Sequence, residues 1–128
     1  MEFKKDELTH TDENGEAKMV DVGGKQETTR SATAEGKIFM NGETIAALRK
    51  QELKKGDVLG VARVAGIQAA KRTSDLIPLC HPLSIDHISV EFRIQEKSLE
   101  IKTTVKTSGR TGVEMEAIMG VNAALITI

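Results

Sequence analysis

The chain has 128 residues, of which 29% are charged, and its formal net charge at pH 7 is −1. This length suits one domain with its own core, and the near-neutral charge argues against proteins that bind nucleic acid through bulk basic charge. The absence of Trp and Tyr, with only three Phe, also excludes an aromatic platform for stacking single-stranded bases.

The amino-terminal segment is polar, and we expect residues 1–18 to form a mobile arm on a single domain covering residues 1–128. It lacks the apolar core of a signal peptide, and no apolar run approaches the roughly 20 residues that span a bilayer. The only cysteine, Cys80, excludes an internal disulfide. A single free thiol fits a reducing compartment, so we expect a cytoplasmic protein without membrane contact.

The first half of the domain predicts a short strand followed by two helices. Residues 33–40 suit a strand that ends at the turn Asn41-Gly42. The next helix begins around Ile45, and we expect it to close at Lys54-Lys55-Gly56. Asp57 suits the N-cap of a second helix, whose last turn would hold Lys71 and Arg72. The glycines Gly60 and Gly66 predict close packing of that helix against another backbone.

The second half predicts a hairpin and a final helix. Apolar residues alternate with polar ones over residues 88–94 and 99–107, and the turn 95–98 joins the two runs. This period of two is typical of an antiparallel hairpin with one buried face. A helix then begins near Thr111-Gly112, with an apolar face formed by Val113, Ile118, Val121, Leu125 and Ile128. The order of elements predicts an α+β domain with helices on one face of an antiparallel sheet. The last turn is apolar and lacks a capping glycine, so we expect the chain to be truncated within this helix.

The segment with the clearest chemical content surrounds Cys80 and His81. Pro78 and Pro82 flank this pair and predict a stiff, extended connection from Leu79 to His81. Neighbours on an extended segment point in opposite directions, which makes a thiol nucleophile with an adjacent histidine base a poor geometry. A lone cysteine is more often a buried apolar residue, and the cysteine and histidines lack the spacing of zinc ligands.

Two further segments carry candidate functional residues. The segment Ser-Gly-Arg-Thr-Gly precedes the last helix, and its backbone amides could bind an anion at the start of that helix. The alternative is that it is only a loop, and that Glu114 and Glu116 lie in the first helical turn because the helix dipole stabilises carboxylates there. These two glutamates are two residues apart, so on a helix they do not share a face. Residues 19–30 predict a polar loop carrying Arg30, either as solvated surface or as an arm that reaches a neighbouring subunit.

Together these segments resemble one family, the cyclic pyranopterin monophosphate synthases (MoaC) of molybdenum-cofactor biosynthesis. The resemblance covers residues 19–128, and its motifs occupy residues 19–22, 27–30, 65–73, 76–83 and 111–117. It implies a ferredoxin-like fold, with a fourth strand after the last helix. It also implies a homohexamer built as a trimer of dimers, with active sites at the dimer interface. The implied lyase reaction converts 3′,8-cyclo-7,8-dihydro-GTP into cyclic pyranopterin monophosphate and releases pyrophosphate. Neither a redox cofactor nor a tightly held metal is implied, and whether Mg²⁺ accompanies the triphosphate stays open.

The resemblance also implies roles for individual residues. Lys55 and Lys71 match family lysines of the catalytic site, and Arg30 matches an arginine expected to contact the triphosphate. The other matching residues are expected to bind substrate; they are Leu79, Cys80, His81, Glu114, Met115 and Glu116. In the family an Asp and a Lys follow the position where this sequence ends, and both are central to catalysis.

Two other functions stay open at this point. One is a non-catalytic nucleotide-binding or assembly module, if the carboxyl-terminal Asp and Lys are absent. The other is a thiol hydrolase that uses Cys80 as its nucleophile. The alternative to a catalytic role for Lys55 and Lys71 is that they are ordinary surface charges at helix ends.

Overall fold

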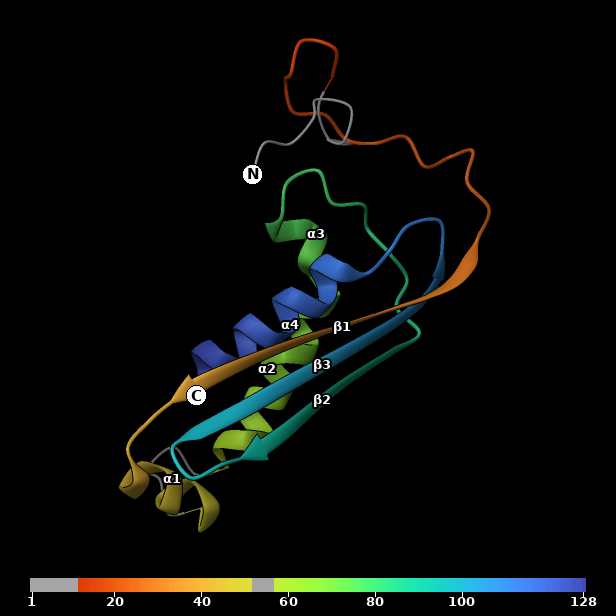
Figure 1. The fold of residues 1–128 in the computed structure, drawn as a ribbon. Helices are drawn as coiled ribbons and strands as arrows, with labels where there is room; N and C mark the ends of the chain where they lie inside the picture. The colour runs from red at the N-terminus through yellow and green to blue at the C-terminus, as the bar shows by residue number, and fades with distance from the viewer. Residues whose placement is uncertain (1–11, 52–56) are drawn as a thin grey trace.

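The computed structural model describes residues 12–51 and 57–128. Its elements in chain order are β1 (Thr28–Phe39), α1 (Gly42–Arg49), α2 (Val58–Lys71), α3 (Thr73–Leu76), β2 (His87–Ile94), β3 (Ser98–Gly109) and α4 (Glu114–Thr127). The strands form one antiparallel sheet in the order β1-β3-β2, and α2 and α4 lie side by side against one of its faces (Figure 1). The predicted α+β architecture, with helices on one face of an antiparallel sheet, is confirmed. None of the described helices is long and apolar enough to cross a membrane.

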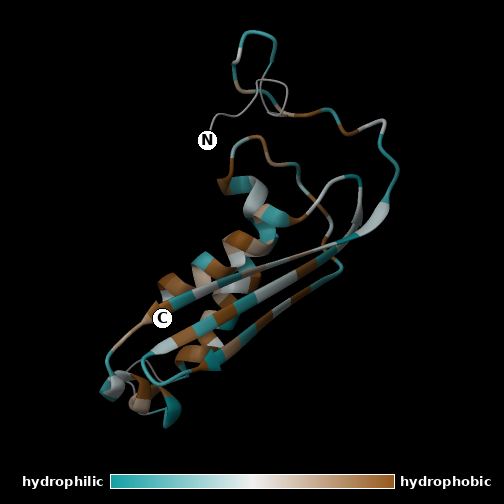
Figure 2. Cartoon of the chain, in the orientation of Figure 1, coloured by the Kyte–Doolittle hydropathy of each residue, from teal (hydrophilic) through white to brown (hydrophobic). Residues whose placement is uncertain are grey.

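Strand β3 is the centre of the sheet because it pairs along its length with both neighbours. The predicted hairpin is present, with β2 paired to β3 from Ile94 opposite Leu99 to His87 opposite Lys106. On the other side β1 pairs from Phe39 opposite Ser98 to Thr28 opposite Gly109. Alternate residues of β3 are buried against the helices: Leu99, Ile101, Thr103, Val105 and Thr107. Figure 2 shows this alternation as a change of colour along the strand, as expected for a sheet with one covered face.

Small residues let α2 and α4 approach each other closely. A side-chain carbon added to Gly66 would lie 3.0 Å from the carbonyl oxygen of Gly120. The prediction of close backbone packing is therefore confirmed at Gly66. At Gly60 it is wrong, because the nearest atoms belong to the side chain of the N-cap residue, Asp57, which accepts the Gly60 amide at 3.0 Å.

Two predicted boundaries differ from the structure. Strand β1 begins at Thr28 rather than Thr33, so Arg30 lies in a strand and not in a loop. The partner strand explains the difference, because β3 continues to Gly109 and offers backbone partners that the local sequence does not reveal. Helix α1 ends at Arg49 instead of continuing to Gly56. Gln51 follows with a left-handed φ of 56°, which an α-helix does not accommodate.

Two further expectations need correction. The connection around Cys80 is not uniformly extended, because Leu79 has a φ of 64°. The last helix begins at Glu114, and Ile118 is 45% exposed instead of lying on its buried face. Apart from Glu116, the buried residues of α4 are small and fit against α2 and the sheet; they are Ala117, Gly120, Val121 and Ala124.

Candidate functional site

The start of α4 and the connection between α3 and β2 together enclose a hollow of about 280 Å³. Its walls are formed by Ile77, Pro78, Leu79, Cys80, His81, Leu83, Thr111, Gly112, Glu114, Met115 and Glu116. The two segments are separated by the whole β2–β3 hairpin in sequence, yet they meet at one end of the sheet (Figure 1). The structure therefore brings together six of the residues predicted to bind substrate. We call this hollow the α4 pocket.

The connection reaches the pocket through a turn at Pro78 and Leu79. Proline fixes its own φ, and the left-handed φ of Leu79 then changes the direction of the chain. Such a backbone is unfavourable for a residue other than glycine and persists only where the surroundings hold it. Further along, the Thr107 hydroxyl donates to the Ser84 carbonyl and ties the connection to β3.

A thiol and a carboxyl group meet on the pocket wall. The Cys80 Sγ donates to Oε2 of Glu116 at 3.5 Å, and Glu116 is only 3% exposed. Burial, reinforced by the nearby carboxylate and by this hydrogen bond, raises the pKa of Cys80 to about 11. Burial also raises the pKa of Glu116 above its ordinary value. The thiol is thus a protonated hydrogen-bond donor and not a thiolate nucleophile.

The two glutamates of the pocket have different environments. Glu114 is exposed, whereas Glu116 is buried two residues later, which confirms that they do not share a face of α4. Met115, between them, is 39% exposed and lines the pocket. The pocket therefore offers one buried carboxyl, one exposed carboxylate and a flexible apolar side chain.

A second hollow, of about 420 Å³, adjoins the α4 pocket and shares His81, Leu83 and Thr111 with it. Arg110 and Glu27 also line this hollow. We call it the Arg110 hollow. Arg30 borders it, since its Nε donates to the carbonyl of Gly109 at 3.3 Å and Gly109 belongs to the lining.

Sequence reasoning did not select Arg110 as a site residue. The signal was present, because Arg110 lies in the Ser-Gly-Arg-Thr-Gly segment interpreted as a possible anion site. In the structure it joins His81 and Arg30 at one end of the sheet. This end thus combines a pocket with apolar and carboxyl walls and a neighbouring hollow with basic side chains.

Lys71, one of the two candidate catalytic lysines, is not brought to these hollows. Lys71 lines a separate hollow of about 290 Å³ together with Asp86 and His87. This hollow shares no lining residue with the α4 pocket or the Arg110 hollow. Lys55 lies outside the described residues. No group of three side chains suited to binding a metal ion occurs within residues 12–51 and 57–128.

Comparison with known proteins decides the family. The model of the MoaC family matches residues 19–128. The chain belongs to the MoaC family. It is 53% identical over 122 residues to the cyclic pyranopterin monophosphate synthase of Peptoclostridium acidaminophilum, and 56% identical over 122 residues to that of Novosphingobium aromaticivorans. Each match covers 95% of this chain and 78% of the relative.

A sequence similar to this chain also forms part of a longer protein. The molybdenum cofactor biosynthesis bifunctional protein of Chlorobaculum tepidum is 56% identical over 122 residues, which cover 95% of this chain but 39% of that protein. All the MoaC motifs recognised in the sequence fall within the matched residues 19–128. The residues that line the α4 pocket and the Arg110 hollow therefore all lie within the part of the chain that matches the MoaC family.

Proposed function

We propose that this MoaC chain is a cyclic pyranopterin monophosphate synthase, a lyase of molybdenum-cofactor biosynthesis. It would convert 3′,8-cyclo-7,8-dihydro-GTP into cyclic pyranopterin monophosphate and release pyrophosphate. One observation carries the proposal beyond the names of its relatives. Two segments distant in sequence, residues 79–81 and 114–116, line a single pocket beside a hollow with basic side chains.

The arrangement suggests how the substrate lies. The fused ring system would occupy the α4 pocket, where the Glu116 carboxyl and the Cys80 thiol offer hydrogen bonds to ring nitrogens and oxygens. The triphosphate would extend into the Arg110 hollow. There the arginines Arg30 and Arg110, with His81, would bind the phosphate oxygens and stabilise the pyrophosphate as it leaves.

Proton transfer in this proposal belongs to lysines. Lys55 would move protons during opening of the purine ring and closure of the pterin ring, and Lys71, with Arg30 and His81, would neutralise the triphosphate. Lys71 lies in a separate hollow of its own protomer. We therefore propose that a second protomer contributes to each site, within a homohexamer built as a trimer of dimers. The enzyme would act in the cytoplasm, with no redox cofactor and no tightly held metal of its own.

The proposal is tested by supplying the cyclised dihydro-GTP and measuring pyrophosphate release. Lys55→Ala should abolish release, because a group that transfers protons contributes about 10²–10⁴-fold to rate. Lys50→Ala, which removes an exposed lysine just after α1, is the matched control and should retain activity. Normal turnover by Lys55→Ala would refute the catalytic role of Lys55. Substrate binding without any release by the unaltered protein would favour a non-catalytic nucleotide-binding module.

A further inference from the structure

The connection between α3 and β2 has to be held in place by individual contacts. It contains neither helix nor strand over residues 77–86, so its backbone lacks the repeated hydrogen bonds that fix a regular element. Yet this connection carries Cys80 and His81, which line the α4 pocket. The geometry of the pocket therefore depends on what fastens the connection to the rest of the fold.

Three hydrogen bonds fasten the end of the connection to the end of β3. The Thr107 hydroxyl donates to the Ser84 carbonyl. The Asp86 amide donates to the Lys106 carbonyl at 2.8 Å, and the Ser108 hydroxyl donates to Oδ2 of Asp86 at 2.9 Å. We call these three bonds the β3 tether.

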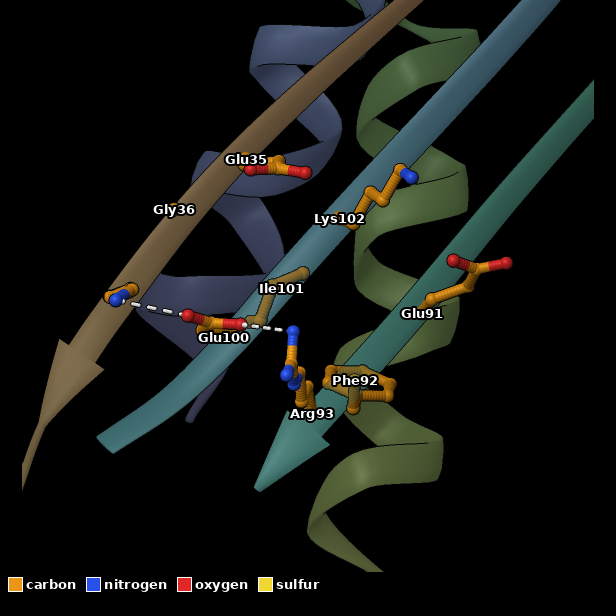
Figure 3. Close-up of a pocket in the computed structure, with 9 residues that line it drawn as sticks. Glu35, Gly36, Glu91, Phe92, Arg93, Glu100, Ile101 and Lys102 are labelled. Atoms are coloured by element: carbon orange, nitrogen blue, oxygen red, sulfur yellow. Dashed lines mark ion pairs between the residues drawn. The ribbon is translucent and has the colours of Figure 1, made fainter. Parts of the chain in front are cut away.

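The β3 tether holds the connection from both faces of the sheet. Figure 3 shows Glu100 and Lys102 of β3 on the face that points away from α2 and α4. Because side chains alternate along a strand, Ser108 lies on this same face, whereas Thr107 lies on the face that the helices cover. The two hydroxyl groups thus reach residues 84–86 from opposite sides.

The two hydroxyl groups differ in their access to water. Thr107 is only 1% exposed, so the Ser84 carbonyl is the partner that satisfies its hydroxyl. Ser108 and Asp86 are both exposed, and water can replace either partner in their hydrogen bond. The bond from Thr107 is therefore the stronger restraint on the connection.

Thr107 is placed where it can control the distance between two parts of the site. Ser84 follows His81 by three residues, and Thr107 precedes Arg110 by three residues. Pro82 lies between His81 and Ser84 and fixes its own φ, so the chain has little freedom to absorb a displacement at Ser84. A change at this hydrogen bond should therefore reach His81.

The size of such a displacement matters for a binding site. A hydroxyl approaches a carbonyl oxygen to about 2.7 Å, whereas a methyl carbon stays about 3.3–3.6 Å away. Exchanging the Thr107 hydroxyl for a methyl group should thus move the Ser84 carbonyl by about 0.6–0.9 Å. Functional groups have to be held within about 0.5 Å of their productive positions.

We propose that Thr107 is a positioning residue for the candidate site, whose hydroxyl acts through the Ser84 carbonyl to hold Cys80 and His81 against α4 and beside Arg110. The expected effect on turnover rests on the proposed function. The expected effect on Cys80 does not, because the contact between its thiol and Glu116 is present without any reaction.

Thr103 provides a matched control on the same strand and the same covered face. It is 0% exposed, and its hydroxyl has no hydrogen-bond partner among the described residues. Thr103→Val therefore removes a hydroxyl that fastens nothing, whereas Thr107→Val removes one that holds the connection. The two variants carry the same substitution at equally buried positions.

Alkylation by iodoacetamide of the native protein, followed by mass spectrometry, tests the position of the connection. Cys80 is the only cysteine, so the rate reports this one site. A thiol that leaves Glu116 loses part of the environment that keeps it protonated. Thr107→Val should therefore react at least about tenfold faster than the unaltered protein, since one pKa unit is a tenfold change in thiolate. Thr107→Ser, which keeps the hydroxyl, and Thr103→Val should both react at the unaltered rate.

A second control separates this effect from a general loss of stability. Leu48 is 4% exposed in α1, at the opposite end of the sheet (Figure 1). Leu48→Ala should destabilise the protein by emptying part of the core, yet Cys80 should stay protected at temperatures where circular dichroism shows the variant to be folded. A role of Thr107 in stability alone would instead make the two variants equally reactive.

Pyrophosphate release from the cyclised dihydro-GTP tests the consequence for the reaction. Thr107→Val should lower kcat/KM about 10–100-fold, because a misplacement approaching 1 Å can cost about 100-fold. Thr107→Ser should restore kcat/KM to within a few fold, as a residue that acts through its hydroxyl requires.

Two results would overturn the proposal: alkylation of Thr107→Val at the unaltered rate, or a Thr107→Ser variant as reactive as Thr107→Val. Should Thr107→Val fail to fold, Thr107→Ala takes its place, because it differs from Thr107→Ser only by the hydroxyl oxygen. An unaltered protein that releases no pyrophosphate would refute the proposed function, while the alkylation rates would still decide the role of Thr107.

Discussion

The Cys80 Sγ and Oε2 of Glu116 lie 3.5 Å apart, although 36 residues separate them in the sequence. This contact joins the connection after α3 to the first turn of α4, the two walls of the α4 pocket. Burial, the nearby Glu116 carboxylate and this hydrogen bond all favour the protonated form of the thiol and raise its pKa. A thiol hydrolase based on Cys80 is therefore disfavoured.

The Cys80 thiol should react slowly with iodoacetamide in the folded protein. A rise of the thiol pKa from 9.0 to about 11 lowers the thiolate fraction about 100-fold at about pH 8, and the thiolate is the reactive form. Mass spectrometry of the alkylated protein, native and in denaturing urea, measures the two rates. Equal rates would show that the thiol is not protected as the structure indicates. Cys80→Ser should retain pyrophosphate release, because a hydroxyl also donates to Glu116.

Burial of Glu116 should make stability depend on pH in a defined direction. Its folded-state pKa is raised above the ordinary 4.5, so the folded state holds this proton more tightly than the unfolded state. The resulting contribution to the free energy of unfolding is fully present below the unfolded pKa and is lost as pH rises through the folded pKa. Glu116→Gln does not titrate. Relative to this variant, the wild type should be more stable at about pH 4 than at about pH 7.

Urea unfolding of the wild type and Glu116→Gln at both pH values measures this difference, and the titration of all other groups cancels between the two proteins. Glu114→Gln, at the exposed neighbour, is the control and should show little such pH dependence. A difference that is constant with pH, or that favours the variant on acidification, would contradict the burial of an ionisable Glu116.

Gly66→Ala should destabilise the fold by about 1–3 kcal/mol, as overpacking of a tight contact does. The added carbon would lie 3.0 Å from the Gly120 carbonyl oxygen and 3.3 Å from a methyl group of Val90. Gly42→Ala is the control, because nothing lies within 4 Å of its added carbon and alanine is favoured in helices. Thermal or urea unfolding compares them. Equal stability of the two variants would mean that α2 and α4 are not in close contact.

Arg110→Ala should raise KM for the cyclised nucleotide about 10–100-fold while leaving the fold intact. The side chain lines the Arg110 hollow and is exposed, so its loss removes a charge-assisted hydrogen bond to phosphate rather than core packing, a loss of about 1.5–3 kcal/mol. Arg49→Ala, on α1 at the opposite end of the sheet, is the matched control (Figure 1). Steady-state pyrophosphate release provides KM for both. An unchanged KM would remove Arg110 from the triphosphate site.

Local pattern predicted the parts of the fold that are decided locally. The hairpin follows from alternation over two neighbouring runs, and Asp57 and the start of α2 follow from capping chemistry. The first five residues of β1 were missed because their strand conformation depends on pairing with β3, far away in sequence. The left-handed φ of Leu79 was also beyond prediction, since non-glycine residues rarely adopt it.

The candidate site, like the fold, could be predicted only in part from the local sequence. Spacing alone indicated that Glu114 and Glu116 lie on different faces, but not that Glu116 is the buried one. The grouping of residues 79–81 with 114–116 came from resemblance to the MoaC family, because no periodicity links two segments that meet only in three dimensions. Arg110 was overlooked for the same reason. Its relation to His81 and Arg30 depends on where β3 ends.

The close approach of Gly66 and Gly120 fixes where α4 lies along α2, as well as the distance between the two helices. Gly120 lies four residues after Glu116 on α4, about 6 Å along the helix axis. A helix held against a neighbouring backbone at one turn has little freedom to slide or rotate at the next. The contact between these two glycines therefore fixes the position of α4, and with it the position at which Glu116 meets Cys80.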